Sequence, residues 1–235
     1  MAALEVLLFD NHLLAVAKPA GVPVVPDASG DESLLEIAKA WLRSELAKPG
    51  AVFLGVVHRL DRPVTGAVLF ARTSKAAARL SEQFRSRAVR KTYLAVLEGE
   101  VADGAGEIVQ WLVKDERANR VRAASSRSPD ARQATTSWSV TERLRGRTLV
   151  RFEPATGRPH QLRVAAADGL GAPILGDLKY GAERALSDRS IALHAAHLAI
   201  LHPTRRAPIE IRCPLPRAPW WSEWGRDATS GAREV

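Results

Sequence analysis

Short apolar runs of strand length, separated by polar or Pro- and Gly-rich stretches, recur along most of the chain. They cover 4–18, with an interruption at 10–12, and then 52–60, 66–72, 91–99, 135–144, 147–155, 190–201 and 208–215. Such runs predict strands, and the Arg145-Gly146-Arg147 sequence between two of them predicts a hairpin turn. We therefore predict an α+β fold with a mixed, mainly antiparallel sheet core and flanking helices.

Helical spacing is confined to a few segments. In 31–50, Ser33 and Glu36 form a capping-box pattern, and Pro49-Gly50 ends the predicted helix. A second helix is predicted over 74–89, with Ser74 as its N-cap and a basic outer face made of Lys75, Arg79, Arg85 and Arg87. A third is predicted over 156–169, opened by Pro159 and closed at Gly169. A short last helix is expected over 219–224.

The composition changes between Lys114 and Arg132. Six basic residues occur there without an apolar cluster, at Lys114, Arg117, Arg120, Arg122, Arg127 and Arg132. We interpret this stretch as an exposed, mobile arm, because strand-like runs resume directly after it. The organisation predicted overall is one catalytic domain over 1–224 and a flexible C-terminal tail over 225–235.

Charge and cysteine content limit the possible partners and compartment. The formal net charge is +8, which favours a polyanionic partner, although a soluble protein can also be basic without one. The single cysteine excludes an intramolecular disulfide and a cysteine-cluster zinc site, which fits a reducing cytoplasm. No segment approaches the roughly 20 apolar residues that span a bilayer. We expect a cytoplasmic monomer without membrane contact.

The loop in HRLDRPVTG holds the first candidate for chemistry. Arg59 and Asp61 lie two positions apart, on the same side of an extended chain, and Gly66 permits a tight return. A carboxylate beside arginine stays ionised and is available as a nucleophile. An aspartate that caps its own turn, or a structural ion pair, would give the same pattern.

Two further stretches could bind an anion or a base. In TGRPHQLR, Arg158, His160 and Arg163 cluster near a predicted helix start, which suits a phosphate or carboxylate but also fits a solvated basic helix end. Tyr93 in KTYLAVL is either a core residue or a platform under a base, and such stacking contributes roughly 1–3 kcal/mol.

Several site classes lack their usual pattern. His194, His197 and His202 follow no common zinc spacing, and the first two would point to opposite faces of a strand. The chain has no P-loop, no GxGxxG and no GxSxG, so motifs for nucleotide hydrolysis, dinucleotide redox chemistry and serine esterases are missing. We expect no cofactor and no metal.

Taken together, the motifs resemble the RluA-like family of RNA pseudouridine synthases, in the family's order from about Leu4 to Leu215. AVAKPAGVPVVP is similar to the family's KPAG loop, HRLDRPVTG to HRLDxxTSG, and KTYLAVLEG to its K-x-Y-x-A strand. TGRPHQLR and APILGDLKYG resemble TGRxHQIR and HPIxGDxxYG, and LHAAHLAILHP resembles a late LHAxxLxFxHP element. The resemblance implies the pseudouridine synthase fold and isomerisation of uridine in ribosomal or transfer RNA, with no cofactor.

The resemblance also implies roles for individual residues. Asp61 matches the catalytic aspartate, which attacks the uridine at C6 or C1′. Arg163 matches its basic partner, and Tyr93 matches the tyrosine that packs on the uracil. Arg59 matches a position that enters the RNA stack when the uridine flips out. The other expected substrate contacts are His58, Arg62, Thr65, Arg158 and His160, with Ile174 or Leu175 closing the base pocket.

Two departures from the family pattern concern the loop and the helix. PVTG replaces the usual Thr-Ser pair before Gly, and AAADGLGAP follows TGRPHQLRV where the family continues RVHxA. The first departure motivates an alternative: an inactive RNA-binding protein that keeps the fold. A metal-dependent nuclease would need a carboxylate or histidine cluster that the sequence does not offer. Because no S4 domain precedes the motifs, RNA contacts are expected from the 117–132 arm and the 79–87 helix face.

Overall fold

The computed structural model describes residues 4–47, 50–102 and 104–224, which divide into two compact units. The first unit runs up to Arg90 and includes His197–Cys213, and the second covers Lys91–Ala196 and the chain from Pro214 onward. Strand β10 (Leu193–Leu201) belongs to the second unit at its start and to the first unit at its end. The tail predicted over 225–235 lies outside the described residues.

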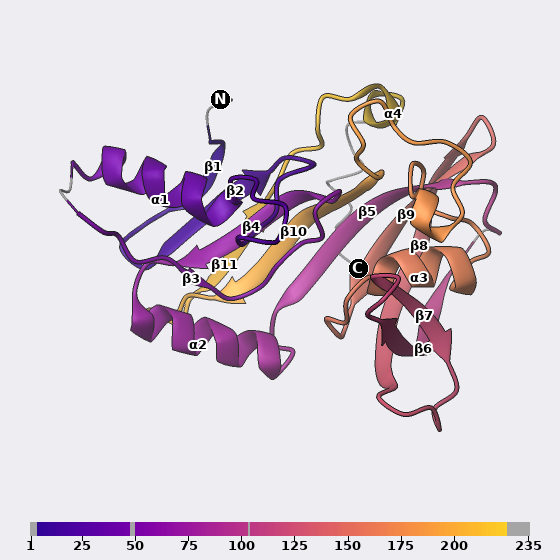
Figure 1. Ribbon diagram of the computed structural model, residues 1–235, viewed down its shortest axis with the longest axis horizontal. Helices are drawn as coiled ribbons and strands as arrows, with labels where there is room; N and C mark the ends of the chain where they lie inside the picture. The colour runs from indigo at the N-terminus through magenta and orange to yellow at the C-terminus, as the bar shows by residue number, and fades with distance from the viewer. Residues whose placement is uncertain (1–3, 48–49, 103, 225–235) are drawn as a thin grey trace. The chain divides into compact units, whose positions relative to one another are not determined.

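The first unit consists of short antiparallel strands and two helices (Figure 1). Its elements are β1 (Val6–Phe9), β2 (Leu13–Lys18), α1 (Leu34–Glu45), β3 (Gly55–Val56), β4 (Thr65–Ala71), α2 (Ser74–Arg85) and β11 (Pro208–Arg212). Strand β2 pairs with both β1 and β4, β3 also pairs with β4, and β11 pairs with β10. The interruption predicted at 10–12 is the β1–β2 turn, where Asp10 Oδ1 accepts hydrogen bonds from the main-chain N–H groups of His12 (2.7 Å) and Leu13 (2.8 Å).

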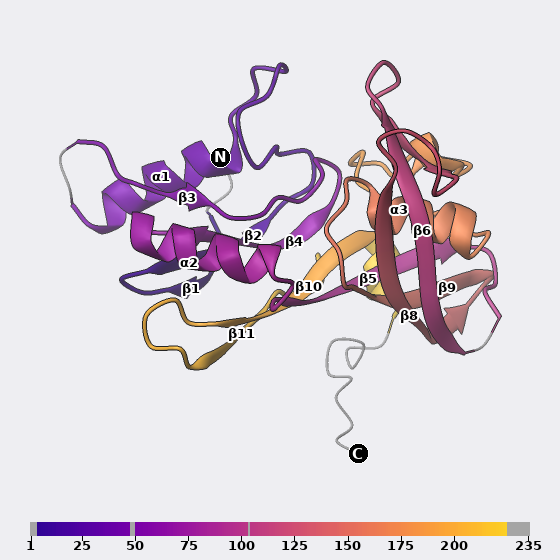
Figure 2. The same cartoon turned by 90° about the horizontal axis from the view of Figure 1, so that it is seen from below.

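The core of this unit lies between the sheet and α2. Ala76 and Leu80 of α2 pack in one cluster with Leu13, Ala15 and Leu69 of the strands, and α2 lies along β3 and β4 in both views (Figure 1, Figure 2). All six residues of β2 except Ala17 are buried, and so is all of β4. Because successive strand residues face opposite sides, these strands are covered on both faces.

The second unit is built on long antiparallel strands. Its elements are β5 (Arg90–Glu98), β6 (Ala105–Asp115), β7 (Arg120–Ala124), β8 (Arg132–Leu144), β9 (Arg147–Pro154), α3 (Gln161–Val164), the π-helical turn η1 (Ala165–Gly169), the 3₁₀ turn η2 (Leu178–Tyr180) and α4 (Pro219–Ser222). The strand order is β5-β9-β8-β6-β7. Helix α3 lies beside β7 of this sheet, and η1 contacts β6 (Figure 1).

The prediction of a mobile arm over 114–132 is wrong. Lys114 and Asp115 end β6, Arg120–Ala124 form β7, and Arg132 begins β8. Strand β7 pairs with β6 from Trp111↔Ala124 to Asp115↔Arg120. The polar composition concealed these strands because only one side of the sheet is buried here: Leu112, Val121 and Ala134 pack inward, while the arginines face solvent.

The helix boundaries differ from the predictions in two places. Thr73, not Ser74, is the N-cap of α2, and its Oγ1 accepts a hydrogen bond from Ala76 N (3.1 Å). The helix predicted over 156–169 begins only at Gln161, because His160 has left-handed backbone angles (φ 49°), and it continues as the π-helical turn to Gly169. The capping box of Ser33 with Glu36 and the last short helix at Pro219–Ser222 are confirmed.

No helix among the described residues is long and apolar enough to cross a bilayer. All strand pairs within the two units for which a register is defined are antiparallel, and helices flank them. The predicted α+β class, with a mainly antiparallel sheet, is confirmed.

Candidate functional site

Asp61 lies in the first unit, in the loop that connects β3 to β4, and its side chain is half-buried. A tight turn follows it, closed by a hydrogen bond from Val64 N to the main-chain oxygen of Asp61 (3.0 Å). Gly66 continues into β4 with φ +124°, a value that side-chain-bearing residues rarely adopt. The main chain itself therefore fixes where the carboxylate is presented.

Lys18 holds this loop in place through its main-chain oxygens, a role that was not predicted from the sequence. Its side chain is 2% exposed, and Nζ donates to the main-chain oxygens of Pro19 (2.8 Å), Arg62 (2.9 Å) and Val64 (2.8 Å). Burial lowers the pKa of Lys18 to about 7, an effect that the nearby Asp61 opposes and Arg62 reinforces. The signal was available in the KPAG motif, where a lysine precedes proline at the end of a buried strand.

The other loop residues take different positions. Arg59 is exposed, as expected for a residue that enters an RNA stack, whereas Thr65 is buried. The Arg62 guanidinium contacts Asp31 and lies 3.9 Å from the Asp27 carboxylate. His58 packs inside the unit: its Nε2 accepts a hydrogen bond from Leu69 N (2.9 Å), and its ring stacks on Phe84 (4.8 Å between centroids). For His58 and Arg62, the observed contacts are with the protein.

Tyr93 lies in the second unit on β5, directly opposite Phe152 of β9, and is half-buried. Two residues before it, Lys91 Nζ donates to the main-chain oxygen of Thr156 (3.1 Å). This bond connects the tyrosine strand with the start of the TGRPHQLR segment. Asp61 belongs to the first unit, and Tyr93 and Arg163 belong to the second.

Arg163 is held by a carboxylate that sequence reasoning missed. Its side chain is 6% exposed, and Nε and Nη2 donate to Oδ2 and Oδ1 of Asp177, at 2.6 Å each. Such a two-point contact fixes the plane of the guanidinium as well as its position. Asp177 is itself buried. It is the aspartate of the GDLKYG motif, and that motif is the feature of the sequence that could have identified it.

Gln161 organises the turn before α3. Its Oε1 accepts hydrogen bonds from Thr156 Oγ1 (2.7 Å) and Arg158 N (3.0 Å). Its Nε2 donates to Thr135 O (3.0 Å) and Thr136 Oγ1 (2.8 Å) on β8. This buried network anchors the segment to the sheet. It explains the glutamine in TGRPHQLR as a structural residue, which the sequence alone did not reveal.

Arg158 and His160 lie in the same turn and both contact the protein. Arg158 Nε donates to Gln133 O (3.0 Å), and His160 Nδ1 lies 2.7 Å from the Tyr180 hydroxyl. Burial is the main cause that raises the pKa of that hydroxyl above 10, so Tyr180 stays protonated at neutral pH. The role of Arg158 and His160 as substrate contacts stays a prediction.

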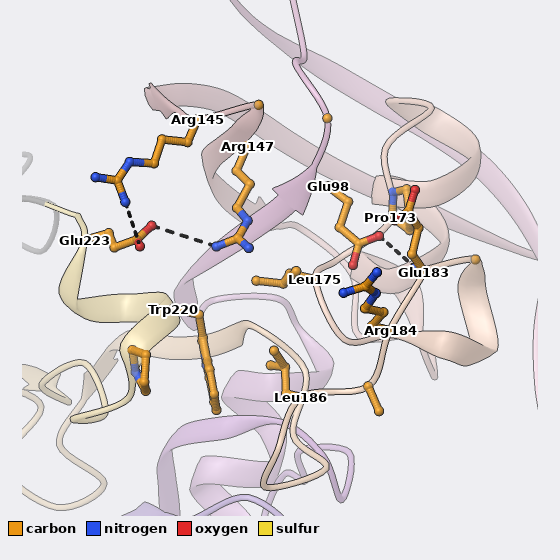
Figure 3. Close-up of a pocket in the computed structure, with 15 residues that line it drawn as sticks. Glu98, Arg145, Arg147, Pro173, Leu175, Glu183, Arg184, Leu186, Trp220 and Glu223 are labelled. Carbon is orange, nitrogen blue, oxygen red and sulfur yellow. Dashed lines mark hydrogen bonds and ion pairs between the residues drawn. The ribbon is translucent and has the colours of Figure 1, made fainter.

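The two residues predicted to close the base pocket differ in exposure. Ile174 is fully buried, whereas Leu175 lines an open cavity of about 930 Å³ in the second unit (Figure 3). Arg184 and Trp220 face the same space, and Arg145 and Arg147 are turned toward Glu223 (3.4 and 3.8 Å). Neither Tyr93 nor Arg163 lines this cavity, so the wall of the base pocket stays a prediction.

The part of the chain that the structure describes contains no group of three or more His, Cys, Asp or Glu side chains arranged to hold a metal ion. His194 is buried on β10, and its ring lies edge-on to Trp221 at 6.1 Å. His202 is also buried, and its Nε2 lies 2.9 Å from Asp10 Oδ2. These histidines are packed into the two units individually.

Comparison with known proteins identifies relatives along nearly the whole chain. The family model for RNA pseudouridylate synthase matches residues 12–168. An uncharacterized RNA pseudouridine synthase of Zymomonas mobilis is 36% identical over 218 residues, which are 92% of this chain and 95% of that protein. Ribosomal large subunit pseudouridine synthase D of Xylella fastidiosa is 35% identical, and the match covers 91% of this chain and 66% of the relative.

A solved structure agrees with the sequence relatives. Human RNA pseudouridylate synthase domain containing 4 superposes with a TM-score of 0.76 at 28% identity, over 91% of this chain and 89% of that one. The family match spans the Asp61 loop, the Tyr93 strand and Arg163. The chain therefore belongs to the RNA pseudouridylate synthase family, which makes it an isomerase that acts on RNA.

Proposed function

We propose that this protein converts uridine to pseudouridine in ribosomal RNA of the large subunit, with Asp61 as the nucleophile. The observation that carries the proposal is the similarity, over 91% and 88% of the chain, to relatives named ribosomal large subunit pseudouridine synthase D and C. Both matches exceed 30% identity. Transfer RNA is the competing substrate.

The chemistry assigned to the site conserves the composition of the nucleotide. Asp61 attacks the flipped uridine at C6 or C1′, the bond between N1 and C1′ breaks, and the uracil turns. C5 then bonds to C1′, the bond between Asp61 and the nucleotide breaks and frees the carboxylate, C5 loses its proton, and N1 gains one. The reaction needs no electron transfer and no energy donor, and the protein's task is to hold the base and stabilise the charge that develops.

Each of the three assigned residues has support from its surroundings. The main chain of the Asp61 loop is fixed by Lys18. Arg163 is buried and held rigidly by Asp177, which suits a cation that acts on a carboxylate or on developing negative charge. Tyr93 is half-buried on a strand, so it is not enclosed in the core, and an aromatic side chain at such a position suits contact with a base.

RNA contacts are assigned to the β6–β7 hairpin, with the protein acting as a monomer. Arg117, Arg122 and Arg127 are exposed on or next to it, and a basic ribbon of this kind suits the phosphate backbone. The basic face of α2 is less available for RNA contacts than expected, because Arg79 donates to Pro203 O (2.7 Å) and Arg85 pairs with Glu82 (2.8 Å).

Tritium release from unmodified transcripts labelled with [5-³H]uridine tests the proposal, because forming the C5–C1′ bond expels the label from C5. We expect release from the large-subunit ribosomal transcript, no release by Asp61→Asn, and wild-type release by Asp168→Asn, which changes an exposed carboxylate. Release from transfer RNA alone would show that transfer RNA, and not large-subunit ribosomal RNA, is the substrate. Binding without release from any RNA would support an inactive RNA-binding protein.

A further inference from the structure

We propose that Tyr180 is the positioning residue for Arg163, and that it connects the β6–β7 hairpin to this arginine. The inference rests on the proposed role of Arg163 in the reaction. Tyr180 ends η2 and is buried, and it packs in the core cluster of Leu112, Val121, Ala134 and Val164. The Tyr180 side chain contacts Arg163, Val121, His160 and Arg120, and the neighbouring Lys179 contacts the hairpin.

The ring of Tyr180 supports the Arg163 guanidinium. Arg163 Cζ lies over the ring, 4.8 Å from its centroid, while Asp177 holds the edge of the same guanidinium. A cation over an aromatic face gains electrostatic attraction, and the gain is larger when the pair is removed from water. Asp177 and Tyr180 are only three residues apart, so a single turn of chain fixes both the edge and the face of the guanidinium.

The hydroxyl of Tyr180 fixes the ring in turn. It accepts a hydrogen bond from Val121 N (2.9 Å), donates to Val121 O (3.0 Å), and lies 2.7 Å from His160 Nδ1. A hydroxyl has one proton and two acceptor positions, so all three contacts are satisfied together when His160 carries a hydrogen on Nδ1. The ring is thus anchored at its far end to β7 and to the turn before α3.

The same η2 turn reaches the hairpin at two more points. Lys179 Nζ donates to Asn119 O (2.8 Å) at the hairpin tip, and Arg120 Cζ lies 5.1 Å from the centre of the Tyr180 ring. Tyr180 therefore has a guanidinium from the hairpin and the guanidinium of Arg163 over one ring. Tyr180 thus contacts both the β6–β7 hairpin, which is proposed to bind RNA, and Arg163, which is proposed to act in the reaction.

Two substitutions separate the contributions of the ring and the hydroxyl. Tyr180→Leu removes both, and Tyr180→Phe removes only the hydroxyl and keeps the ring under Arg163. The single-turnover rate of tritium release at saturating RNA is measured beside the RNA dissociation constant. We expect the rate to fall about 100-fold for Tyr180→Leu and roughly 10-fold for Tyr180→Phe, with affinity changed less than about twofold, because a displaced group loses rate rather than binding.

Leu112→Ala is the matched control, because it loosens the same core cluster without removing a contact to Arg163. If it lowers the rate as much as Tyr180→Leu at equal loss of thermal stability, general loosening explains the effect and the inference fails. Should Tyr180→Leu not fold, Tyr180→Phe decides the question by the same comparison.

Arg163→Lys and Asp61→Asn separate this inference from the function on which it rests. If both variants keep the wild-type rate, the roles proposed for Asp61 and Arg163 are wrong, and the positioning role of Tyr180 falls with them. If both lose the rate while Tyr180→Leu and Tyr180→Phe keep it, the proposed function stands and the positioning role is overturned.

Discussion

Asp177 and Arg163 form a buried two-point ion pair, with both N···O distances at 2.6 Å. They lie 14 positions apart along the chain, and the end of α3, η1 and a connection with several glycines lie between them. Two charges removed from water are costly unless each satisfies the other in good geometry. The pair therefore connects α3 directly to the turn that carries Asp177.

Replacing Asp177 by asparagine should destabilise the fold strongly. An amide has no charge and offers one acceptor oxygen, so the buried guanidinium loses both neutralisation and one hydrogen bond. We expect the free energy of unfolding to fall by about 3 kcal/mol, the scale for breaking a buried pair. Urea denaturation measures this, with the exposed Asp168→Asn as control; a loss equal to the control would contradict the prediction.

Lys18 should make stability depend on pH in the neutral to basic range. In the folded protein burial lowers the pKa of Lys18 to about 7, whereas an unfolded lysine titrates near 10.5. Between pH 7 and 9 the unfolded chain therefore binds more protons, and the free energy of unfolding rises with pH. One proton corresponds to a slope of about 1.4 kcal/mol per pH unit.

The Lys18→Met variant isolates this contribution. Denaturation at several pH values should show the slope in the wild type and its loss in the variant, while Lys39→Met, at a partly exposed lysine of α1, keeps the wild-type slope. Parallel curves for the wild type and Lys18→Met would disprove the assignment. Below pH 7, Lys18 should add no slope, so the free energy of unfolding of the wild type and of Lys18→Met should change with pH in the same way.

The N-cap of α2 should show which of two neighbouring hydroxyls matters. Thr73→Ala removes the acceptor for Ala76 N and is expected to cost about 1 kcal/mol of stability. Ser74→Ala changes a residue inside the first turn and should cost no more than a few tenths. Thermal denaturation of the two variants measures the difference, and equal losses would assign the cap to both.

Gln161→Met should destabilise the turn before α3. Two of its four hydrogen bonds are buried and the other two are partly buried, so removing the amide leaves Thr135 O and Arg158 N without their partner in this network. We expect a loss of about 2 kcal/mol. Gln133→Met, at an exposed side chain of β8, is the control in the same urea titration. A loss no greater than the control's would mean that water replaces the network.

RNA binding should depend on salt through the β6–β7 hairpin. The slope of log affinity against log salt concentration should become less negative by about 2 when Arg117, Arg122 and Arg127 are removed together. Each phosphate contact on single-stranded RNA contributes about 0.7 to this slope. The control removes three exposed arginines elsewhere, Arg43, Arg189 and Arg217, and so changes the net charge equally. The same slope for both triple variants would move the RNA contact away from the hairpin.

Buried strands and the capping box of α1 could be predicted from the sequence, whereas the N-cap of α2 was placed one residue too late. The apolar runs that became β2, β4, β5 and β9 are buried on at least one face and contain few polar residues. Ser33 and Glu36 are only three residues apart, so their capping box needs no tertiary information. Predictions of this kind depend on neighbours along the chain, which is what a sequence displays directly.

The hairpin and the supporting residues could not be predicted in the same way. The polar composition of β6 and β7 hides strands whose partners lie across the sheet. Asp177 and Tyr180 act on Arg163 and Val121, which are 14 and 59 residues away along the chain. Lys18 bonds main-chain oxygens 44 and 46 residues later. No local pattern encodes such distances, and only the family motifs indicated that these residues matter.

The three carbonyl contacts of Lys18 also bear on how freely the Asp61 loop can vary. The ammonium holds main-chain oxygens, and the turn after Asp61 is closed through main-chain atoms, so neither contact depends on which side chain occupies position 64. Val64 is 2% exposed, so the side chain at this position of the loop is enclosed in the protein. The backbone path of the PVTG loop is therefore set in part by a lysine 46 positions earlier in the chain, through contacts that a substitution at position 64 leaves in place.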